Sequence, residues 1–289
     1  MLEHLNLQPV KPARVVIVGA GGFIGGAIRK KLLADSVEVL PLTRKEVDLL
    51  SADAAGKLAQ MLRPTDSVVM VSAIAPAKTV PMLMQNLKMA EAVCATLSEK
   101  PIAHLLYVSS DAVYADDANP VMESSSCAPS TLHGMMHAAR ELMLKSATRA
   151  PVAILRPTLV YGANDPHNGY GPNRFRRQAE KGEPIAIFGE GEERRDHILV
   201  DDVVALAALM LAHRSRGALN AVTGVSTSFR DIAQMIAAQF DHRVPVASMP
   251  RAGPRPHLLH RFFDITDCLK AFPQFRHTPL AEGLALSRG

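Results

Sequence analysis

The segment from residue 15 to residue 26 constrains the fold of this chain more than any other. It reads Val-Val-Ile-Val-Gly-Ala-Gly-Gly-Phe-Ile-Gly-Gly, an apolar run that leads through a glycine-rich turn into a helical pattern. Glycine permits a tight turn and lets backbone N–H groups approach a ligand, and a helix that starts there directs its dipole at a phosphate. A strand, a loop and a helix in this order predict a pyrophosphate site, with a plain glycine-rich turn as the alternative.

Short apolar runs alternate with longer helical patterns through the first two thirds of the chain. This alternation is typical of βαβ units, in which helices cover both faces of a parallel sheet. The sequence therefore predicts the α/β class, with a Rossmann-type doubly wound parallel sheet. The expected strands are 15–18, 37–40, 67–72, 105–109 and 152–155, and the expected helices are 25–34, 54–62, 82–99 and 132–149.

Glycine and proline punctuate short segments after Tyr161, which is typical of a loop-rich lobe that covers a ligand. We expect a Rossmann domain over 12–165 and a small C-terminal substrate-binding lobe over 166–289. The lobe would consist mainly of 166–195 and 226–289, while 196–225 returns to the domain. Further helices are expected at 201–212 and 229–240, with a short element around 266–272.

Composition excludes several classes of protein. The three cysteines are far apart, so neither a disulfide framework nor a thiolate zinc site is indicated. The formal charge of +4 is dispersed, which suits an anionic small ligand better than nucleic acid. The longest apolar run, Val203–Ala212, is far short of the roughly 20 residues that span a bilayer, and the first residues lack the apolar centre of a signal peptide. We therefore expect a cytoplasmic protein with no nucleic-acid or membrane partner.

The spacing of the glycines carries a resemblance to a known family. Gly19, Gly22 and Gly25, with Phe23 and Ile24 between them, resemble the short-chain dehydrogenase/reductase superfamily. The resemblance is to its extended branch, the NAD(P)-dependent sugar-nucleotide epimerases, dehydratases and reductases, and it runs from about residue 14 to about residue 240. It implies that these five residues bind the dinucleotide.

The end of the second strand bears on the choice of cofactor. An NAD enzyme usually has a carboxylate there for the adenosine ribose, whereas this chain has Thr43 followed by Arg44 and Lys45. Two cations without a carboxylate favour NADP over NAD, as in GDP-fucose synthase-type reductases, unless they belong to a solvated turn. The resemblance implies further cofactor contacts at Asp48, Ser72 and Ala73.

An apolar strand over residues 106–109 ends in hydroxyl groups and resembles the family's Ser/Thr-Ser/Thr-x-x-Val-Tyr segment, with Tyr114 as its last residue. The resemblance implies that Ser110 binds the substrate oxygen and shares its proton, and that Asp111 stands where the family's 4,6-dehydratases carry an acid. Without the resemblance, Ser109 and Ser110 are better explained as a cap at the end of a strand.

The following helix departs from the family at two positions. Its members carry Tyr-x-x-x-Lys, in which the tyrosine exchanges a proton as hydride moves at the nicotinamide and the lysine holds the nicotinamide ribose. Alignment on Gly134 and Glu141 puts His133 at the tyrosine position and His137 at the lysine position.

Several interpretations of this histidine pair stay open. In the first, His133 is the acid/base group, because imidazole titrates near neutral pH, and His137 donates to the ribose. Imidazole reaches about 2 Å less far than a phenol, so the substrate would have to sit closer. In the second, the protein is a catalytically weak or inactive NAD(P)-binding sensor or partner-binding protein. In the third, His133 and His137 chelate a metal ion at i, i+4, but no further ligand is evident, so we expect no metal. In the fourth, the two histidines have no function.

A second segment suggests how the substrate is bound. The segment over residues 184–203 resembles the family's Gly-x-x-x-Arg-Asp-x-x-x-Val-x-Asp pattern, which implies that Arg195 clamps the diphosphate of a nucleotide sugar. The alternative is a surface arginine paired with Glu192 or Glu193. The resemblance also suggests substrate contacts at Asn86 and Tyr161.

Together these patterns predict an NAD(P)-dependent oxidoreductase or epimerase that acts on a nucleotide-diphosphate sugar, or on a related carbonyl or alcohol. From the resemblance we also expect a homodimer formed through helices 82–99 and 132–149.

Overall fold

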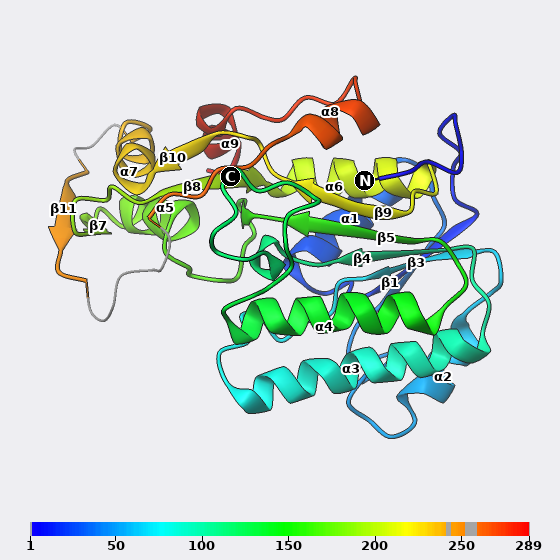
Figure 1. The fold of residues 1–289 in the computed structure, drawn as a ribbon. Helices are drawn as coiled ribbons and strands as arrows, with labels where there is room; N and C mark the ends of the chain where they lie inside the picture. Colours follow the sequence, from blue (N-terminus) through cyan, green and yellow to red (C-terminus); the bar gives the residue numbers. More distant parts are fainter. Residues whose placement is uncertain (1, 241–243, 252–258, 289) are drawn as a thin grey trace.

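A computed structural model describes residues 2–240, 244–251 and 259–288. The chain forms a larger part around a central sheet and a smaller lobe, which lies at the left in Figure 1. No helix in the described ranges is both long and apolar enough to cross a membrane.

The central sheet is parallel throughout, with the strand order β2-β1-β3-β4-β5-β9. Its strands are β1 (Arg14–Val18), β2 (Val39–Leu42), β3 (Asp66–Met70), β4 (His104–Val108), β5 (Val152–Pro157) and β9 (Gly217–Ala221). Every residue of β1, β3 and β4 is buried, as expected of strands that helices cover on both faces. The predicted α/β fold with a doubly wound parallel sheet is confirmed.

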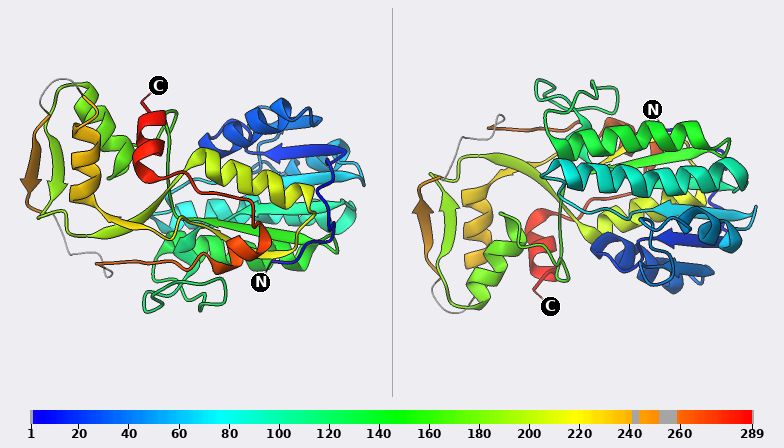
Figure 2. Two further views of the ribbon diagram at one scale, coloured as in Figure 1. Left: turned by 90° about the horizontal axis from the view of Figure 1, so that it is seen from above. Right: turned by 90° about the horizontal axis from the view of Figure 1, so that it is seen from below.

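Alternate residues of β1 face two separate cores, one on each side of the sheet. Val15 and Ile17 pack in the first core and Val16 and Val18 in the second. The helices of the first layer are α1 (Phe23–Ala34) and α6 (Val200–Ala212), and those of the second are α2 (Ala54–Met61), α3 (Val80–Glu99) and α4 (Leu132–Ala147). Figure 2 shows these layers from opposite sides of the molecule.

The second strand begins two residues later than its apolar run predicts. Val37 donates its backbone N–H to the carbonyl of Leu32 at 2.9 Å, which closes the turn that ends α1. The strand then continues through Pro41 to Leu42. Proline is tolerated there because β2 is an edge strand and its missing N–H costs no ladder bond.

The smaller lobe has two short sheets and a core of its own. The first sheet has the order β10-β8-β6 and the second pairs β11 with β7. Its elements are β6 (Leu159–Tyr161), α5 (Pro172–Glu180), β7 (Ile185–Phe188), β8 (Arg194–Leu199), β10 (Ser226–Ser228), α7 (Phe229–Ala237), β11 (Val246–Met249) and α9 (Leu280–Leu286). Phe175, Ile232 and Leu284 are buried in its core.

The chain passes between the two parts more than once. It returns to the larger part through α6 and β9, and again through α8 (Thr266–Ala271), whose Cys268 packs in the core beneath α6. The division into a domain over 12–165 and a lobe over 166–289 stays a prediction.

Candidate functional site

Two cavities adjoin each other over the carboxyl ends of the parallel strands, where the strand order reverses between β1 and β3. The first, of about 360 Å³, has four histidines in its wall and is called the histidine cavity. The second, of about 480 Å³, lies beside Thr43 and is called the Thr43 cavity. Because Gly22, Val71 and Ala73 line both cavities, the two form one elongated crevice.

The turn after β1 leaves no room for a side chain at two of its glycines, Gly19 and Gly25. Gly19 has a φ of +104°, and a Cβ atom there would lie 2.6 Å from the backbone N of Ser72. A Cβ atom on Gly25 would lie 2.2 Å from the carbonyl oxygen of Gly19. α1 begins at Phe23, and its N-cap Gly22 offers no side-chain cap. The first N–H groups of α1 are therefore left for a ligand, and the loop fits the pyrophosphate of a dinucleotide.

The Thr43 cavity brings together the residues expected at its end of the crevice. Thr43, Arg44, Asp48, Ser72 and Ala73 all line it. The side chain of Arg44 is 79% exposed and forms an ion pair with Asp48, with 3.0 Å between Nη2 and Oδ2. Asp48 also accepts a hydrogen bond from the backbone of Leu50. Arg44 is therefore close to the cavity, but a carboxylate already partners it.

Glu46 is a charged neighbour of this cavity that our sequence reasoning missed. Its carboxylate accepts hydrogen bonds from the backbone N and the Oγ1 of Thr43 at 2.7 and 2.6 Å. The hydrogen bond from the Thr43 side chain is the main cause that lowers the pKa of Glu46. The spacing Thr-x-x-Glu is that of a capping box, which is the signal that would have found this pair.

The two serines at the end of β4 differ in their surroundings, although both line the histidine cavity. Ser109 is buried and donates a hydrogen bond to Glu141 at 2.6 Å. Ser110 is partly exposed; its Oγ accepts from the backbone N of Ala112 and caps a short 3₁₀ helix, η1 (Asp111–Val113). Asp111 turns toward Thr158, and burial raises the pKa of its carboxyl. The cap expected as an alternative is therefore present, and it leaves the Ser110 hydroxyl in the cavity wall.

A buried ion pair supports this wall from behind. Arg156 Nη2 lies 2.6 Å from Glu141 Oε2, and both side chains are 5% exposed. Arg156 also donates to the hydroxyl of Tyr114, which in turn donates to Asn220. Ser109 is therefore tied to the supporting network, whereas Ser110 donates only a long hydrogen bond, 3.3 Å, to Asp111 and lines the cavity.

His133 and His137 lie on α4 and both line the histidine cavity. Their ring centroids are 4.8 Å apart in an edge-to-face arrangement. The Nδ1 of His133 accepts a long hydrogen bond, 3.5 Å, from the backbone N of Ala77. The Nδ1 of His137 lies 2.7 Å from the hydroxyl of Tyr107. Burial is the main cause that lowers the pKa of both imidazoles, so both are neutral at pH 7.

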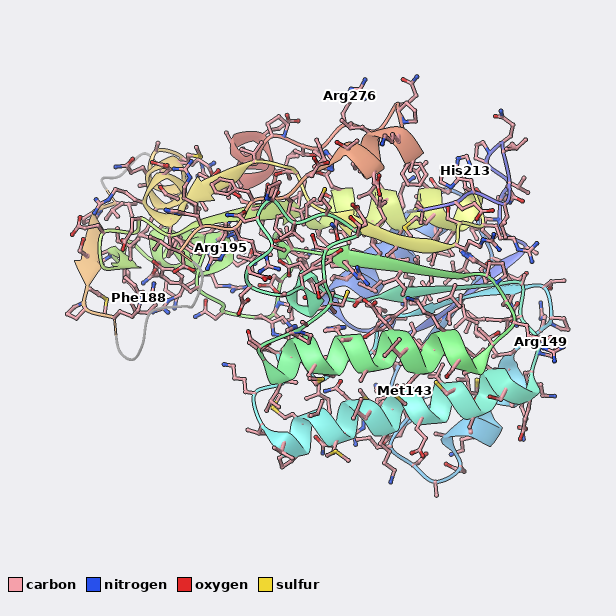
Figure 3. All side chains as sticks on the ribbon, in the orientation of Figure 1. Met143, Arg149, Phe188, Arg195, His213 and Arg276 are labelled. Carbon is pink, nitrogen blue, oxygen red and sulfur yellow. The ribbon has the colours of Figure 1, made fainter. Side chains whose placement is uncertain are left out.

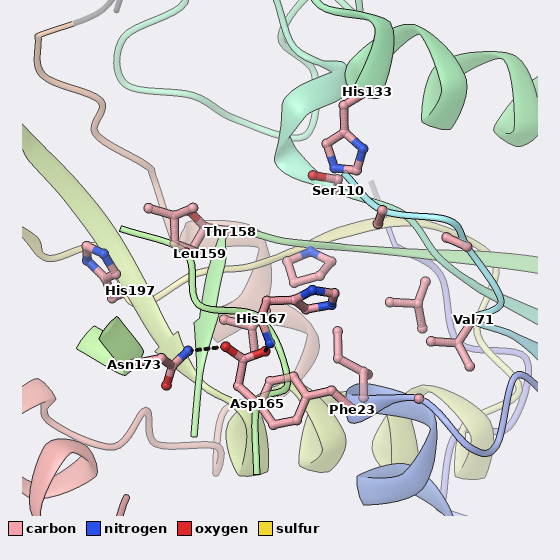
Figure 4. A pocket seen from close by; sticks show the side chains of 18 of the residues that line it. Phe23, Val71, Ser110, His133, Thr158, Leu159, Asp165, His167, Asn173 and His197 are labelled. Atoms are coloured by element: carbon pink, nitrogen blue, oxygen red, sulfur yellow. Dashed lines mark hydrogen bonds between the residues drawn. The ribbon is translucent and has the colours of Figure 1, made fainter. Parts of the chain in front are cut away.

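Residues from the loop before α5 and from β8 complete the cavity, and the sequence reasoning did not find them. Figure 4 shows His133 and Ser110 on one side, with Asp165, His167 and Phe23 across from them. Asn173 donates to Asp165 at 2.7 Å, which fixes the loop. These residues form no sequence motif, because the loop lies beside the cavity only in the folded chain.

His197, on β8, also lines the histidine cavity. It is 4% exposed, and burial lowers its pKa to about 4. Leu159, at the start of β6, lines the same cavity with 42% of its surface exposed. This end of the cavity therefore combines an apolar side chain with a neutral imidazole. In the parts of the chain that the structure describes, no group of three or more His, Cys, Asp or Glu side chains is arranged to hold a metal ion.

Two residues expected to contact the substrate, Asn86 and Tyr161, are buried in supporting positions. Asn86 is fully buried and uses its amide to accept from the N–H of Ile74 and to donate to the carbonyls of Ile74 and Met82. Tyr161 is buried, and its hydroxyl packs closely against α9: a Cβ atom on Gly283 would lie only 2.0 Å from it. Asn86 therefore fixes the loop after β3, and Tyr161 packs in the core of the lobe; their contacts with a substrate stay predictions.

Arg195 lies on β8, in the lobe beside the larger part of the molecule (Figure 3). It pairs with Glu193 at 2.7 Å, as in the alternative that we considered. Glu193 also pairs with Arg251 at 2.9 Å, so two guanidinium groups share one carboxylate. Both guanidinium groups have the planar form that suits phosphate oxygens.

Comparison with known proteins agrees with the fold and the loop. A model of the NAD dependent epimerase/dehydratase family matches residues 15–223. The chain is 26% identical over 216 residues to an uncharacterized UDP-glucose epimerase, YtcB, of Bacillus subtilis. The alignment covers 70% of this chain and 66% of that protein. It is 26% identical to GDP-L-fucose synthase of Escherichia coli, with 94% of each chain covered.

A solved structure is similar over almost the whole chain. It is a mutant of UDP-glucuronic acid 4-epimerase from Bacillus cereus, in complex with UDP-4-deoxy-4-fluoro-glucuronic acid and NAD. The TM-score is 0.82 at 19% identity, with 95% of this chain and 98% of that chain covered. At this identity the likeness concerns the fold.

Proposed function

Because the chain belongs to the NAD dependent epimerase/dehydratase family, we propose that it binds a nicotinamide dinucleotide along the crevice and transfers hydride to or from a nucleotide-diphosphate sugar, or a related carbonyl or alcohol. One observation carries the proposal: a glycine loop that admits a pyrophosphate opens directly into a cavity lined by Ser110 and His133. The names of the relatives support the substrate class.

NADP is the favoured cofactor and NAD is the alternative. Thr43 carries no charge, and Arg44 and Lys45 line the cavity beside it, which supports a 2′-phosphate. The carboxylates of Asp48 and Glu46 are close by and oppose an additional anion. Binding of NADP would therefore require Arg44 to leave Asp48, whereas NAD makes no such demand.

In the proposed reaction the bound nicotinamide supplies or accepts the hydride. Ser110 donates a hydrogen bond to the substrate oxygen, and His133 takes the proton of an alcohol or returns it to a ketone. His133 is suited to the first role because burial keeps it neutral. His137 orients the ribose. Burial raises the pKa of the Asp111 carboxyl, which favours its protonated form, and Asp111 would act as an acid only in a dehydration.

Arg195 would bind the substrate diphosphate. Its guanidinium is planar and suits two phosphate oxygens, and Arg251 adds a second positive charge on the other side of Glu193. Binding would replace part of the Arg195–Glu193 pair.

A catalytically weak or inactive NAD(P)-binding sensor or partner-binding protein is the second candidate. One contact favours it: the N–H of Ala77 is directed at Nδ1 of His133, the proposed base. A neutral imidazole that uses Nδ1 as an acceptor carries its proton on Nε2, where it donates and does not act as a base.

One experiment separates the two candidates. The purified protein is incubated with NADP(H) or NAD(H) and a panel of nucleotide sugars, and both thermal stabilisation and cofactor absorbance are followed. Turnover that His133→Phe abolishes without weakening cofactor binding supports the enzyme. Stabilisation without turnover across the panel supports the binding protein, and no stabilisation by any dinucleotide contradicts both.

For the expected homodimer, the support is an exposed apolar face on the layer of α3 and α4. Met84, Met135 and Leu142 are 57%, 47% and 69% exposed there. Light scattering of the native protein and of Leu142→Glu tests this, with a native dimer and a monomeric variant as the expected result.

A further inference from the structure

Three side chains form a buried layer behind the histidine cavity. The hydroxyl of Tyr107 lies 2.7 Å from Nδ1 of His137. The guanidinium carbon of Arg140 lies 5.3 Å from the centre of the Tyr107 ring. Tyr107, His137 and Arg140 are 1%, 5% and 0% exposed. Strand alternation places Tyr107 on the α4 side of β4, where His137 and Arg140 meet it one helical turn apart.

Arg140 brings a permanent charge into this layer. Its Nη2 donates to the carbonyl of Ser72 at 2.7 Å, and its Nη1 to the sulfur of Met136. Within the described ranges no carboxylate forms an ion pair with it. Burial is the main cause that lowers the pKa of His137 and keeps that imidazole neutral, and His133 and the charge of Arg140 add to it.

The proton between Tyr107 and His137 has one favourable position. If Nδ1–H donated to the phenol oxygen, the phenol hydrogen would need another acceptor, and the described part of the chain offers none. A buried donor left unsatisfied in this way destabilises the arrangement. If the phenol donates, both groups are satisfied, and the Arg140 charge over the ring strengthens the phenol as a donor.

We infer that Tyr107 is a positioning residue: its hydroxyl donates to Nδ1 of His137 and so holds the imidazole in the tautomer that carries its hydrogen on Nε2. His137 lines the cavity, so its Nε2–H is the donor available to a ligand there. The inference rests on the proposed function only for the identity of that ligand, the nicotinamide ribose. The arrangement gives a neutral donor at a position where the resemblance leads one to expect lysine.

The test begins on the native protein without any ligand. Histidine labelled with ¹⁵N reports, through its two-bond ¹H–¹⁵N couplings, which ring nitrogen carries the hydrogen, and His137→Gln identifies the signal. We expect a protonated Nε2 and a bare Nδ1 for His137. A protonated Nδ1 would overturn the inference. The tautomer itself is read from the native protein, and His137→Gln serves only to assign the signal.

Two variants extend the test. Tyr107→Phe should convert the His137 signal to that of exchanging tautomers and weaken the binding of the preferred dinucleotide by about 2- to 10-fold, as loss of one neutral hydrogen bond allows. Tyr161→Phe removes another buried phenol, in the lobe core, and should change neither property. An unchanged tautomer or an unchanged dissociation constant in Tyr107→Phe would overturn the positioning role. Failure of the native protein to bind any dinucleotide would instead overturn the proposed function, because the tautomer is measured without ligand.

Discussion

The two ends of the crevice are built in different ways. The glycine loop and the Thr43 cavity depend on the backbone, since Gly19 and Gly25 act there by having no side chain. The histidine cavity depends on side chains that a second layer of buried groups holds in place, among them Glu141 and Tyr107. In a site built from backbone, steric exclusion prevents substitution of the glycines. In a site built from side chains, residues can be substituted in the sequence while the site keeps its shape.

If the side-chain end depends on its second layer, removing the ion pair behind it should have the largest effect. Arg156→Met leaves the buried carboxylate of Glu141 without its partner, and we expect a loss of about 3–5 kcal/mol in the free energy of unfolding, measured by denaturant titration. Arg63→Met breaks an exposed pair with Glu38 and should change stability by about 0.5 kcal/mol or less. Similar losses in the two variants would contradict the dependence.

The backbone end should tolerate a methyl group at one glycine and not at its neighbour. Gly25→Ala places a Cβ atom 2.2 Å from a carbonyl oxygen, so the loop must shift; we expect a loss of about 2–3 kcal/mol and of dinucleotide binding. Gly26→Ala, where the nearest atom is 3.6 Å away, should be neutral or stabilise α1 by up to about 1 kcal/mol. Thermal unfolding with and without dinucleotide compares them, and equal behaviour would refute steric exclusion.

This contrast also explains what the sequence could predict. The glycine spacing and the alternation of apolar runs are local, so the sheet and the loop could be inferred. The partners of His137 and Asn86 could not, because β4 and the loop after β3 reach them only in the folded chain. Tyr161 shows the same limit, since nothing near it in sequence indicates that α9 covers it.

The histidine end should also be the end that responds to acid. Burial lowers the pKa of His197 to about 4, so the unfolded chain, with a pKa of about 6.5, binds the proton more tightly. The stability due to neutral His197 is fully present above about pH 6.5 and is lost as the pH falls toward 4; the loss amounts to about 2 kcal/mol at pH 5. Asp196, with a pKa raised by burial to about 6, works in the opposite direction and reduces the net change.

A variant isolates the histidine contribution to this pH dependence. His197→Phe keeps Asp196 and should therefore lose less stability than the native protein between pH 7 and pH 5, measured by denaturant titration. His167→Gln, which replaces an exposed histidine of the same cavity, should keep the native profile. A native profile in His197→Phe would show that the buried imidazole does not control the response.

The smallest effect tests whether a side chain decides specificity at the backbone end as well. Arg44→Asp removes the cation beside Thr43 and sets a second carboxylate near Asp48, so we expect NADP(H) to bind about tenfold more weakly and NAD(H) to change little. Lys57→Asp reverses the charge of another exposed i, i+4 pair, on α2, and should affect both cofactors equally. Dissociation constants from cofactor fluorescence decide the matter. Equal losses for NADP(H) and NAD(H) in Arg44→Asp would mean that Asp48 neutralises Arg44 in the bound state. This end of the crevice would then recognise only the pyrophosphate, which both cofactors share and which the backbone loop binds.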